Sequence, residues 1–353
     1  MKSRVAVAMS GGVDSAVAAW RLLEEGYQPT GVTLELWTQS GSKQTAETVA
    51  HAARVCRILG IPHQSIDIRT EFETRIVQSF ARQYLAGLTP NPCVDCNHAV
   101  KWRSILQFAK REGIPKVATG HYARLVRNRD TGRYEIRKGI DRSKDQSYVL
   151  WQLDQGQLAD TILPLGDFSK NEVIDLANRN QLVESIAQES QDICFIPHNS
   201  YREFLESYLP QELAKIGTGE LVDAEGNVLG CHDGFFNFTI GQRKGFRMGF
   251  GERRYVQSID PARNLVVIGE DESLYRKAMY IGNLNWVAGE PCDSIRGEMK
   301  IRYHHSGAEC QVTRLEDGRY IVRFMEAQRA ITPGQAAVLY DGDRLLFGAT
   351  ILE

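Results

Sequence analysis

The stretch from Arg4 to Ser15 constrains the fold of this chain more than any other. Arg4–Met9 is almost wholly apolar and predicts a short strand buried on both faces. A turn with two adjacent glycines follows, and from Val13 to Leu23 apolar side chains recur at helical spacing. A strand, a tight turn and a helix in this order are typical of the first unit of a parallel α/β sheet. Ligands of such sheets bind beyond the carboxyl ends of the strands.

The turn itself has the composition of a phosphate-binding loop, Ser10-Gly11-Gly12-Val13-Asp14-Ser15. Its glycines let an anion approach the backbone, and the free N–H groups at the start of a helix attract negative charge. Ser10 and Ser15 can donate hydroxyl hydrogen bonds to phosphate, whereas Asp14 is suited to holding Mg²⁺. The Gly-Lys-Ser/Thr of a Walker-type loop is missing. A plain strand-to-helix turn is the alternative interpretation.

Strands and helices continue to alternate over residues 1–200, which predicts a parallel-sheet α/β domain. We expect further strands at Gln28–Trp37, His63–Ile68 and Lys116–Thr119, and helices at Thr45–Leu59, Glu71–Ala86 and Val100–Glu112.

Beyond residue 200 the pattern changes, and glycine becomes frequent. Residues 201–276 predict a small, mostly β central domain that begins with a helix at Tyr201–Leu209 and has a hairpin turn at Asp223–Asn227. Residues 277–353 predict a C-terminal antiparallel β-barrel or sandwich. Its expected strands are Met299–Tyr303, Cys310–Arg314, Tyr320–Phe324, Ala336–Tyr340 and Leu345–Ile351, with hairpin turns at Asp317-Gly318 and Asp341-Gly342.

Charge is distributed unevenly along the 353 residues, although the net charge is only −2. Residues 101–144 hold 13 Lys and Arg against 4 Asp and Glu, while the remainder holds 29 against 40. Such a local excess predicts a basic surface that docks a nucleic acid. A solvated, charge-rich hairpin is the alternative.

The chain has seven cysteines, an odd number. Its N-terminus lacks the features of a signal peptide, and its apolar runs are too short to span a bilayer. We therefore expect a cytoplasmic protein with reduced thiols. Cys93 and Cys96 precede the expected helix at Val100–Glu112, where the helix terminus and Lys101 should lower a thiol pKa. Cys194 lies near the end of the α/β region. Four alternatives remain open: a redox pair, part of a zinc site, an iron–sulfur cluster on all three thiols, or a catalytic pair of Cys96 and Cys194.

The phosphate loop resembles the signature of the PP-loop ATP pyrophosphatase superfamily, whose members cleave ATP to AMP and pyrophosphate. Taken with later motifs, the whole chain resembles the tRNA-specific 2-thiouridylase family. The motifs are Thr89–Pro92 with Cys96-Asn97, Ala118–Tyr122, Asp141 with Lys144–Tyr148, Ile193–Ile196, Thr239–Gly245, Arg302-Tyr303 and Thr332–Gln335.

That resemblance implies roles for individual residues. Cys96 would be the catalytic nucleophile and Cys194 the carrier of a persulfide. ATP would contact Ala8, Met9, Ser10, Gly11, Gly12, Val13, Asp14, Ser15, Leu34 and Gly120. tRNA would contact Asn91, Pro92, Cys93, His121, Lys144, Asp145, Gln146, Arg302, Tyr303 and Gln335. Many members have Asp at the position of Cys93, which leaves the role of this thiol open.

The resemblance also implies an activity: ATP-dependent 2-thiolation of the wobble uridine in the anticodon arm of Lys, Glu and Gln tRNAs. ATP would adenylate the C2 oxygen with the help of Mg²⁺, and a cysteine desulfurase or sulfur-relay protein would supply sulfur. Two alternatives are another PP-loop ligase or amidotransferase, and iron–sulfur-dependent thiolation on Cys93, Cys96 and Cys194.

Overall fold

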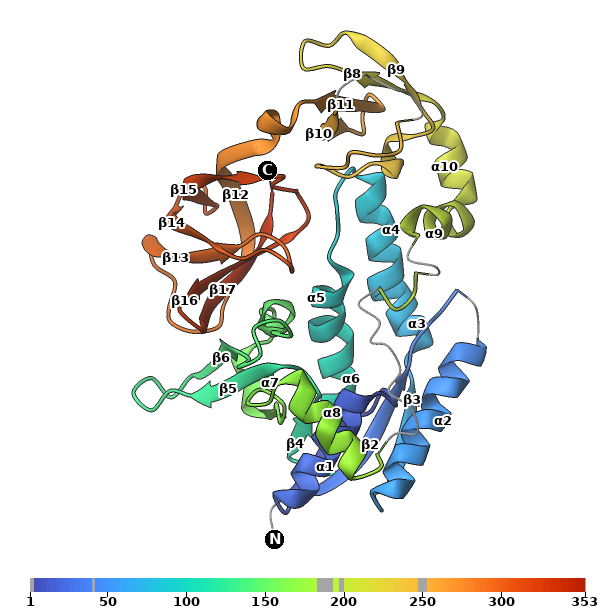
Figure 1. Cartoon of the computed structure of the whole chain (residues 1–353), viewed down its shortest axis with the longest axis vertical. Helices are drawn as coiled ribbons and strands as arrows, with labels where there is room; N and C mark the ends of the chain where they lie inside the picture. Colours follow the sequence, from blue (N-terminus) through green and yellow to red (C-terminus); the bar gives the residue numbers. More distant parts are fainter. Residues whose placement is uncertain (1–2, 40–41, 183–192, 197–199, 247–252, 353) are drawn as a thin grey trace.

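The fold is taken from a computed structural model, which describes residues 3–39, 42–182, 193–196, 200–246 and 253–352. Three units follow one another along the chain (Figure 1). The N-terminal α/β unit lies at the bottom of the view, the small central unit at the top and the C-terminal barrel at the left. The α/β class, the mostly β centre and the C-terminal barrel are therefore confirmed.

A five-stranded sheet with every pairing parallel forms the base of the N-terminal unit, in the order β3-β2-β1-β4-β7. Its strands are β1 (Arg4–Ala8), β2 (Gln28–Glu35), β3 (His63–Asp67), β4 (Lys116–Ala118) and β7 (Thr161–Ile162). Side chains on β1 alternate between two cores: Val5 and Val7 pack with α1 (Val13–Glu24), whereas Ala6 packs with the helix Arg103–Arg111 on the other face. Burial on both faces explains why β1 is a continuous apolar run.

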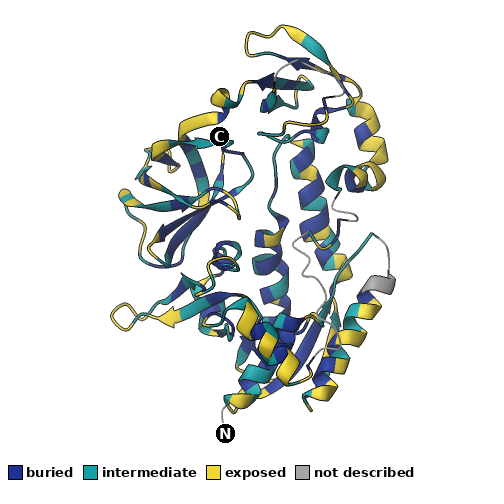
Figure 2. Cartoon of the chain, in the orientation of Figure 1, coloured by how far each residue is buried: buried dark blue, intermediate teal, exposed yellow. Residues whose placement is uncertain are grey.

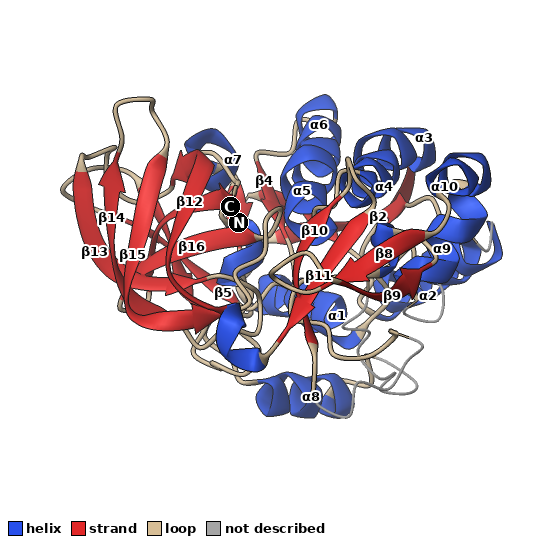
Figure 3. Ribbon diagram, turned by 90° about the horizontal axis from the view of Figure 1, so that it is seen from above, coloured by secondary structure: helices blue, strands red, loops and turns tan. Residues whose placement is uncertain are grey.

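The remaining helices lie on both sides of the sheet when seen from above (Figure 3), except that the two around Gln78–Leu85 and Pro92–Cys96 rise from it toward the central unit (Figure 1). They are α2 (Ser42–Ile58), α3 (Arg69–Phe72), a π-helical turn η1 (Glu73–Val77), α4 (Gln78–Leu85), α5 (Pro92–Cys96), a second π-helical turn η2 (Asn97–Trp102), α6 (Arg103–Arg111), η3 (Ser147–Leu150), α7 (Gln155–Ala159) and α8 (Lys170–Arg179). The expected helix at Val100–Glu112 is thus wrong at its start. Pro92 begins a continuous helical stretch, so Cys93 and Cys96 lie within it rather than before it.

A hairpin of β5 (Ala123–Arg127) and β6 (Tyr134–Lys138) leaves the N-terminal unit and extends the C-terminal sheet. The link is a backbone pairing of β6 with the last strand, at Arg137 and Arg344. The N-terminal and C-terminal units therefore share a sheet.

The central unit holds a four-stranded sheet in the order β10-β11-β8-β9. Its elements are α9 (Tyr201–Tyr208), α10 (Pro210–Ile216), β8 (Gly219–Val222), β9 (Val228–His232), η5 (Phe235–Asn237), β10 (Tyr255–Asp260), β11 (Leu265–Gly269) and η6 (Asp271–Leu274). The expected entry helix and the hairpin turn at Asp223–Asn227 are confirmed. Phe204 of α9 and Phe80 of α4 lie in one core cluster, so this unit packs directly on the N-terminal one.

Six strands close the C-terminal barrel: β12 (Tyr275–Trp286), β13 (Ser294–Lys300), β14 (Ala308–Arg314), β15 (Tyr320–Arg329), β16 (Ala336–Asp341) and β17 (Arg344–Ile351). Closure occurs because β12 pairs with both β15 and β17, and the strand interiors are buried (Figure 2). One expected strand is misplaced, since β13 ends at Lys300 and leaves Arg302 and Tyr303 in the following turn. Within the described residues, no helix is long and apolar enough to cross a membrane.

Candidate active site

The loop Ser10–Ser15 lies at the carboxyl end of β1 and is shaped by its own hydroxyl groups. Ser15 Oγ donates to the Gly12 carbonyl at 3.0 Å and accepts from the Ser10 backbone N–H at 3.2 Å. Gly11 has a φ of +77°, and a Cβ there would lie 2.8 Å from Cβ of His51. Only glycine fits this position. Ser15 is buried, whereas Ser10 and Gly12 are exposed and open to a ligand.

Asp14 is the first acidic residue of α1, and its carboxylate has two strong partners. Oδ1 accepts from the Tyr122 hydroxyl and from Lys170 Nζ, each at 2.6 Å. Gly120 borders the same place, because a Cβ at Gly120 would lie 2.9 Å from the Asp14 carbonyl carbon. Sequence motifs from β4 and the first loop therefore meet at one edge of the sheet.

The remaining residues expected at ATP also lie at this edge. Ala8 ends β1, Met9 donates its backbone N–H to the Val32 carbonyl at 2.8 Å, and Leu34 is next to the last residue of β2. Val13 and Met9 are buried in the core beneath the loop, so they support the loop from below rather than face a ligand.

The three candidate thiols lie within electrostatic range of Lys101. A π-helical turn closes with i→i+5 bonds, so η2 brings position 101 over position 96, where an α-helix would bring Val100. Lys101 is half-buried and interacts electrostatically with Cys96, Cys194 and Cys93. The charge of Lys101 therefore reaches thiols from two chain segments about a hundred residues apart in sequence.

Burial raises the pKa values of these three thiols, whereas the sequence predicted a lowered thiol pKa. Desolvation raises the pKa of Cys96 to about 12, with Lys101 opposing it only in part. Cys93 and Cys194 have exposed surfaces, yet the protein packed around them still raises the pKa of both thiols by desolvation. All seven cysteines lie in the described ranges, and each is a free thiol.

His121 links the thiols to the phosphate loop, since it follows Gly120 and lies near Lys101. Its Nδ1 is 2.8 Å from Thr119 Oγ1, and its ring lies 5.3 Å from that of Trp102. Burial, together with the charge of Lys101, lowers the pKa of His121 to about 3. The imidazole is therefore neutral at pH 7 and does not serve as a phosphate-binding cation.

The residues expected at tRNA occupy different environments. Arg302 is exposed and Tyr303 half-buried in the turn after β13, with the Tyr303 ring 6.0 Å from that of Tyr148. Lys144 is half-buried in the loop that follows β6. Asp145, by contrast, is buried, and its carboxylate accepts from the Gly139 and Ser147 backbone N–H groups at 3.0 and 3.1 Å.

The other expected contacts join segments to one another. Gln146 and Tyr122 exchange hydrogen bonds at 2.9 and 3.0 Å. Gln335 Nε2 donates to the Thr89 and Pro90 carbonyls at 2.8 and 3.3 Å. Asn91, at the start of α5, hydrogen-bonds the Tyr148 side chain, and Pro92 is buried behind it.

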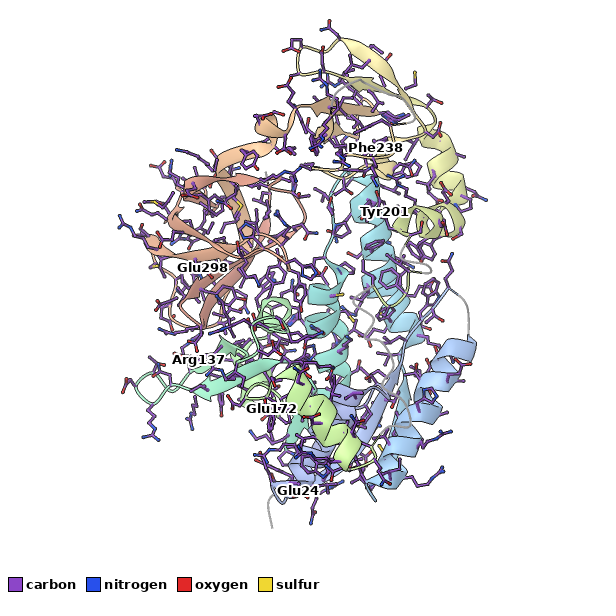
Figure 4. The ribbon with its side chains drawn as sticks, in the orientation of Figure 1. Glu24, Arg137, Glu172, Tyr201, Phe238 and Glu298 are labelled. Carbon is purple, nitrogen blue, oxygen red and sulfur yellow. The ribbon has the colours of Figure 1, made fainter. Side chains whose placement is uncertain are left out.

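Among the ion pairs described for this structure, seven involve different cations of the thirteen in residues 101–144. The pairs are Arg103–Glu71, Arg111–Glu112, Lys116–Asp160, Arg124–Asp343, Arg133–Glu290, Arg137–Glu135 and Lys138–Glu298. Four of the cations lie on the hairpin, and three of their acidic partners lie on the barrel; Figure 4 labels Arg137 and Glu298 on the two sides. Three of these cations therefore help to dock the hairpin on the barrel, while the basic surface for nucleic acid stays a prediction.

Among the described residues, no group of three or more His, Cys, Asp or Glu side chains is arranged to hold a metal ion. Sequence reasoning also missed Lys170. The capping box of Ser169 and Glu172 was a readable signal for a helix start, but nothing local indicated that this helix packs beside α1.

Comparisons with known proteins agree with this architecture. Three family models match in order: a tRNA methyl transferase HUP domain at residues 3–198, a tRNA methyl transferase PRC-barrel domain at 202–270 and an aminomethyltransferase β-barrel domain at 276–351.

Curated relatives match over nearly the whole chain. The chain is 45% identical to a tRNA-specific 2-thiouridylase of Heliobacterium modesticaldum, over 100% of this chain and 93% of the relative. It is 43% identical to one of Chloroflexus aggregans, over 99% and 98%. A solved 4-thiouridine synthetase–RNA complex with bound ATP is 22% identical, with a TM-score of 0.37 over 59% of this chain and 50% of that one. The full-length matches show that the chain belongs to the tRNA-specific 2-thiouridylase family.

Proposed function

We propose that this protein is a tRNA-uridine 2-sulfurtransferase, which uses ATP to replace the C2 oxygen of the wobble uridine with sulfur in Lys, Glu and Gln tRNAs. The observations that support the proposal are that Lys101 lies within electrostatic range of the thiols of Cys93, Cys96 and Cys194 and of His121, and that the neighbouring Gly120 packs against Asp14 of the phosphate loop. A site that activates an oxygen beside a site that holds sulfur is what thiolation requires.

The first step is activation of the carbonyl, because a uridine C2 oxygen is a poor leaving group. The oxygen attacks the α-phosphorus of ATP, and the bond to the β-phosphate breaks as pyrophosphate leaves. Backbone N–H groups at the start of α1 face the developing charge. Asp14 is the carboxylate placed to hold Mg²⁺, which would neutralise the departing pyrophosphate when bound with ATP. Gly11 keeps the loop in this conformation, because a side chain there would meet His51.

The second step transfers sulfur from Cys194 to C2 of the uridine. The terminal sulfur of a Cys194 persulfide attacks C2, and the Cys96 thiolate attacks Sγ of Cys194, breaking the S–S bond. The electrons of that bond pass to the transferred sulfur, and AMP leaves with the former C2 oxygen. The products are 2-thiouridine and a Cys96–Cys194 disulfide, which an external thiol reduces. Alternatively, Cys96 releases hydrosulfide first, and hydrosulfide attacks C2.

Cys96 is buried with a raised pKa, so it must become accessible before either reaction. Binding of tRNA is the natural trigger, because the target base has to leave the anticodon stack to reach this site. We infer that Arg302, Tyr303 and Lys144 contact the anticodon arm directly, by shape and phosphate contacts. The internal bonds of Asp145, Gln146 and Gln335 favour a positioning role for these three residues.

We also place unit boundaries near residues 200 and 276 and propose a cytoplasmic location, since reduced thiols persist there. A cysteine desulfurase or sulfur-relay protein would load Cys194. Iron–sulfur-dependent thiolation is the alternative, although the described donor groups do not converge as metal ligands. A stoichiometric cluster in anaerobically purified, active protein would establish that route instead.

The test combines the protein with ATP, Mg²⁺, a cysteine desulfurase, cysteine and unmodified tRNA, followed by nucleoside analysis. We expect 2-thiouridine, AMP and pyrophosphate in equal amounts. Cys194→Ser should abolish the product while sparing ATP and tRNA binding, whereas Cys231→Ser, at an exposed cysteine on β9, should leave it unchanged. A methylated uridine, or ammonia-dependent product without any need for Cys194, would refute the proposal.

A further inference from the structure

The disulfide left by the proposed sulfur transfer has one accessible and one shielded sulfur. Cys194 is exposed, whereas Cys96 is only 4% exposed. A thiol from outside therefore reaches the Cys194 sulfur, and attack there leaves Cys194 bonded to the reductant and unable to accept new sulfur. Attack on Sγ of Cys96 releases Cys194 instead. The thiol placed for that attack is Cys93, which is exposed and lies three residues before Cys96 on α5.

Helix geometry brings Cys93 and Cys96 together independently of any electrostatic effect. Residues three apart on a helix are surface neighbours, with Cβ atoms about 5–6 Å apart. A disulfide needs about 3.5–4.5 Å between its Cβ atoms, so a small local adjustment joins the two thiols, and the bond that forms is strained. Strained, exposed disulfides are the ones that reductants cleave readily. Cys93 also lies within electrostatic range of Cys194, so all three thiols belong to one site.

We propose that Cys93 is the resolving thiol of the catalytic cycle, which breaks the Cys96–Cys194 disulfide and frees Cys194 for the next sulfur. The inference rests on the proposed sulfurtransferase function. The Cys93 thiolate forms an S–S bond to Cys96, and the electron pair of the old bond leaves on Cys194, where the charge of Lys101 stabilises the thiolate. This exchange involves no net oxidation. A dithiol reductant then cleaves the exposed Cys93–Cys96 disulfide, supplying two electrons and two protons and becoming a disulfide itself.

The first experiment identifies the disulfide that remains after one turnover. The protein is loaded with sulfur by a cysteine desulfurase and cysteine, given ATP, Mg²⁺ and excess unmodified tRNA without reductant, quenched in acid and alkylated. Peptide mass spectrometry should find a Cys93–Cys96 disulfide with Cys194 alkylated. Cys93→Ser should retain the Cys96–Cys194 disulfide, and Cys231→Ser, the matched control at an exposed cysteine on β9, should give the wild-type pattern. A Cys96–Cys194 disulfide as the main product of the wild type would overturn the inference.

The second experiment measures how turnover depends on reductant. A thiol within the same site acts at an effective concentration of millimolar or more, so at about 0.1 mM dithiothreitol Cys93→Ser should lower the ratio of steady-state to first-turnover rate about 10-fold. About 10 mM dithiothreitol should restore that ratio, because the reductant then replaces the missing thiol. The ratio, taken at saturating tRNA, cancels any effect of position 93 on tRNA binding, and added reductant does not repair a structural defect. An unchanged ratio at low dithiothreitol contradicts the role of Cys93.

Two further outcomes separate this inference from the function on which it rests. If Cys93→Ser does not fold, Cys93→Asp carries the same comparisons, since many members of the family have Asp at this position. A stoichiometric iron–sulfur cluster in active protein would overturn the resolving role, because the three thiols would then be its ligands. Wild-type protein that makes no 2-thiouridine defeats the proposed function, whereas 2-thiouridine formed with the other disulfide defeats the inference alone.

Discussion

Replacement of Gln335 by glutamate tests whether the barrel positions the segment that leads to Cys93 and Cys96. The Gln335 amide donates to the Thr89 and Pro90 carbonyls, and the Thr89 N–H donates to the Pro333 carbonyl at 3.0 Å. Gln335→Glu replaces the donor with a charged acceptor facing two carbonyls. Losing two hydrogen bonds of about 1 kcal/mol each, with some added repulsion, should weaken this contact by roughly 2–3 kcal/mol.

A loss of that size lowers the equilibrium constant for docking of the segment roughly 30-fold to 150-fold. We expect amide hydrogen exchange across residues 89–96 to accelerate by about this factor and the single-turnover thiolation rate at saturating tRNA to fall. Affinity for ATP should not change, because the phosphate loop lies on β1, away from this contact. Gln311→Glu removes a comparable bond on the exposed barrel surface and is the matched control.

Weaker tRNA binding without faster hydrogen exchange would refute the positioning role of Gln335. If Gln335 acts only by touching RNA, Gln335→Glu should raise the dissociation constant for tRNA while leaving hydrogen exchange over residues 89–96 unchanged in the free protein. Unaltered exchange therefore rules out the positioning role, whatever happens to activity.

Three other predictions follow from burial and backbone geometry. Iodoacetamide at pH 8 should alkylate Cys194 well before Cys96, because Cys194 has exposed surface whereas Cys96 is buried and burial raises its pKa to about 12; peptide mass spectrometry gives the order, and equal rates would contradict it. Asp145→Ala should lower the free energy of unfolding, measured by urea denaturation, by roughly 3 kcal/mol, because it leaves the Gly139 and Ser147 N–H groups without their acceptor. A change under 1 kcal/mol would argue for a surface role. Gly11→Ala should abolish ATP binding, whereas Gly26→Ala, with a similar φ but open surroundings, should cost only about 1–3 kcal/mol of stability; ATP binding by Gly11→Ala would show that the loop tolerates displacement by His51.

The sequence predicted correctly those elements that depend on residues close together in the chain. The strand and loop at Arg4–Ser15 and the hairpin turns at Asp317 and Asp341 depend on side-chain alternation and on glycine, both readable in a short window. The start of the cysteine helix was misjudged because Asn91-Pro92 reads as a break. Proline is instead favoured in the first turn, where its missing N–H costs nothing.

Features that depend on distant partners were not readable. The β5–β6 hairpin was not predicted as strands, and its sheet is completed by β17, about two hundred residues later. The thiol pKa values also depend on distant partners. Proximity to a helix start predicted a lowered pKa for Cys96, but burial among Phe195, Val100 and their neighbours raises it instead.

The ion pairs of the hairpin bear on how the two ends of the chain act together. Lys138 pairs with Glu298 at 2.8 Å with only 14% of its side chain exposed, and β6 is bonded to β17 in the same place. On the other side of the barrel, Gln335 holds the segment before α5. The barrel therefore contacts the N-terminal unit at two places, the β6 hairpin and the segment that leads into the Cys96 helix. If tRNA contacts Arg302 and Lys144 as proposed, it binds at the barrel and at the loop after the hairpin together, and we expect that binding to shift the segment before Cys96 through the Gln335 contact.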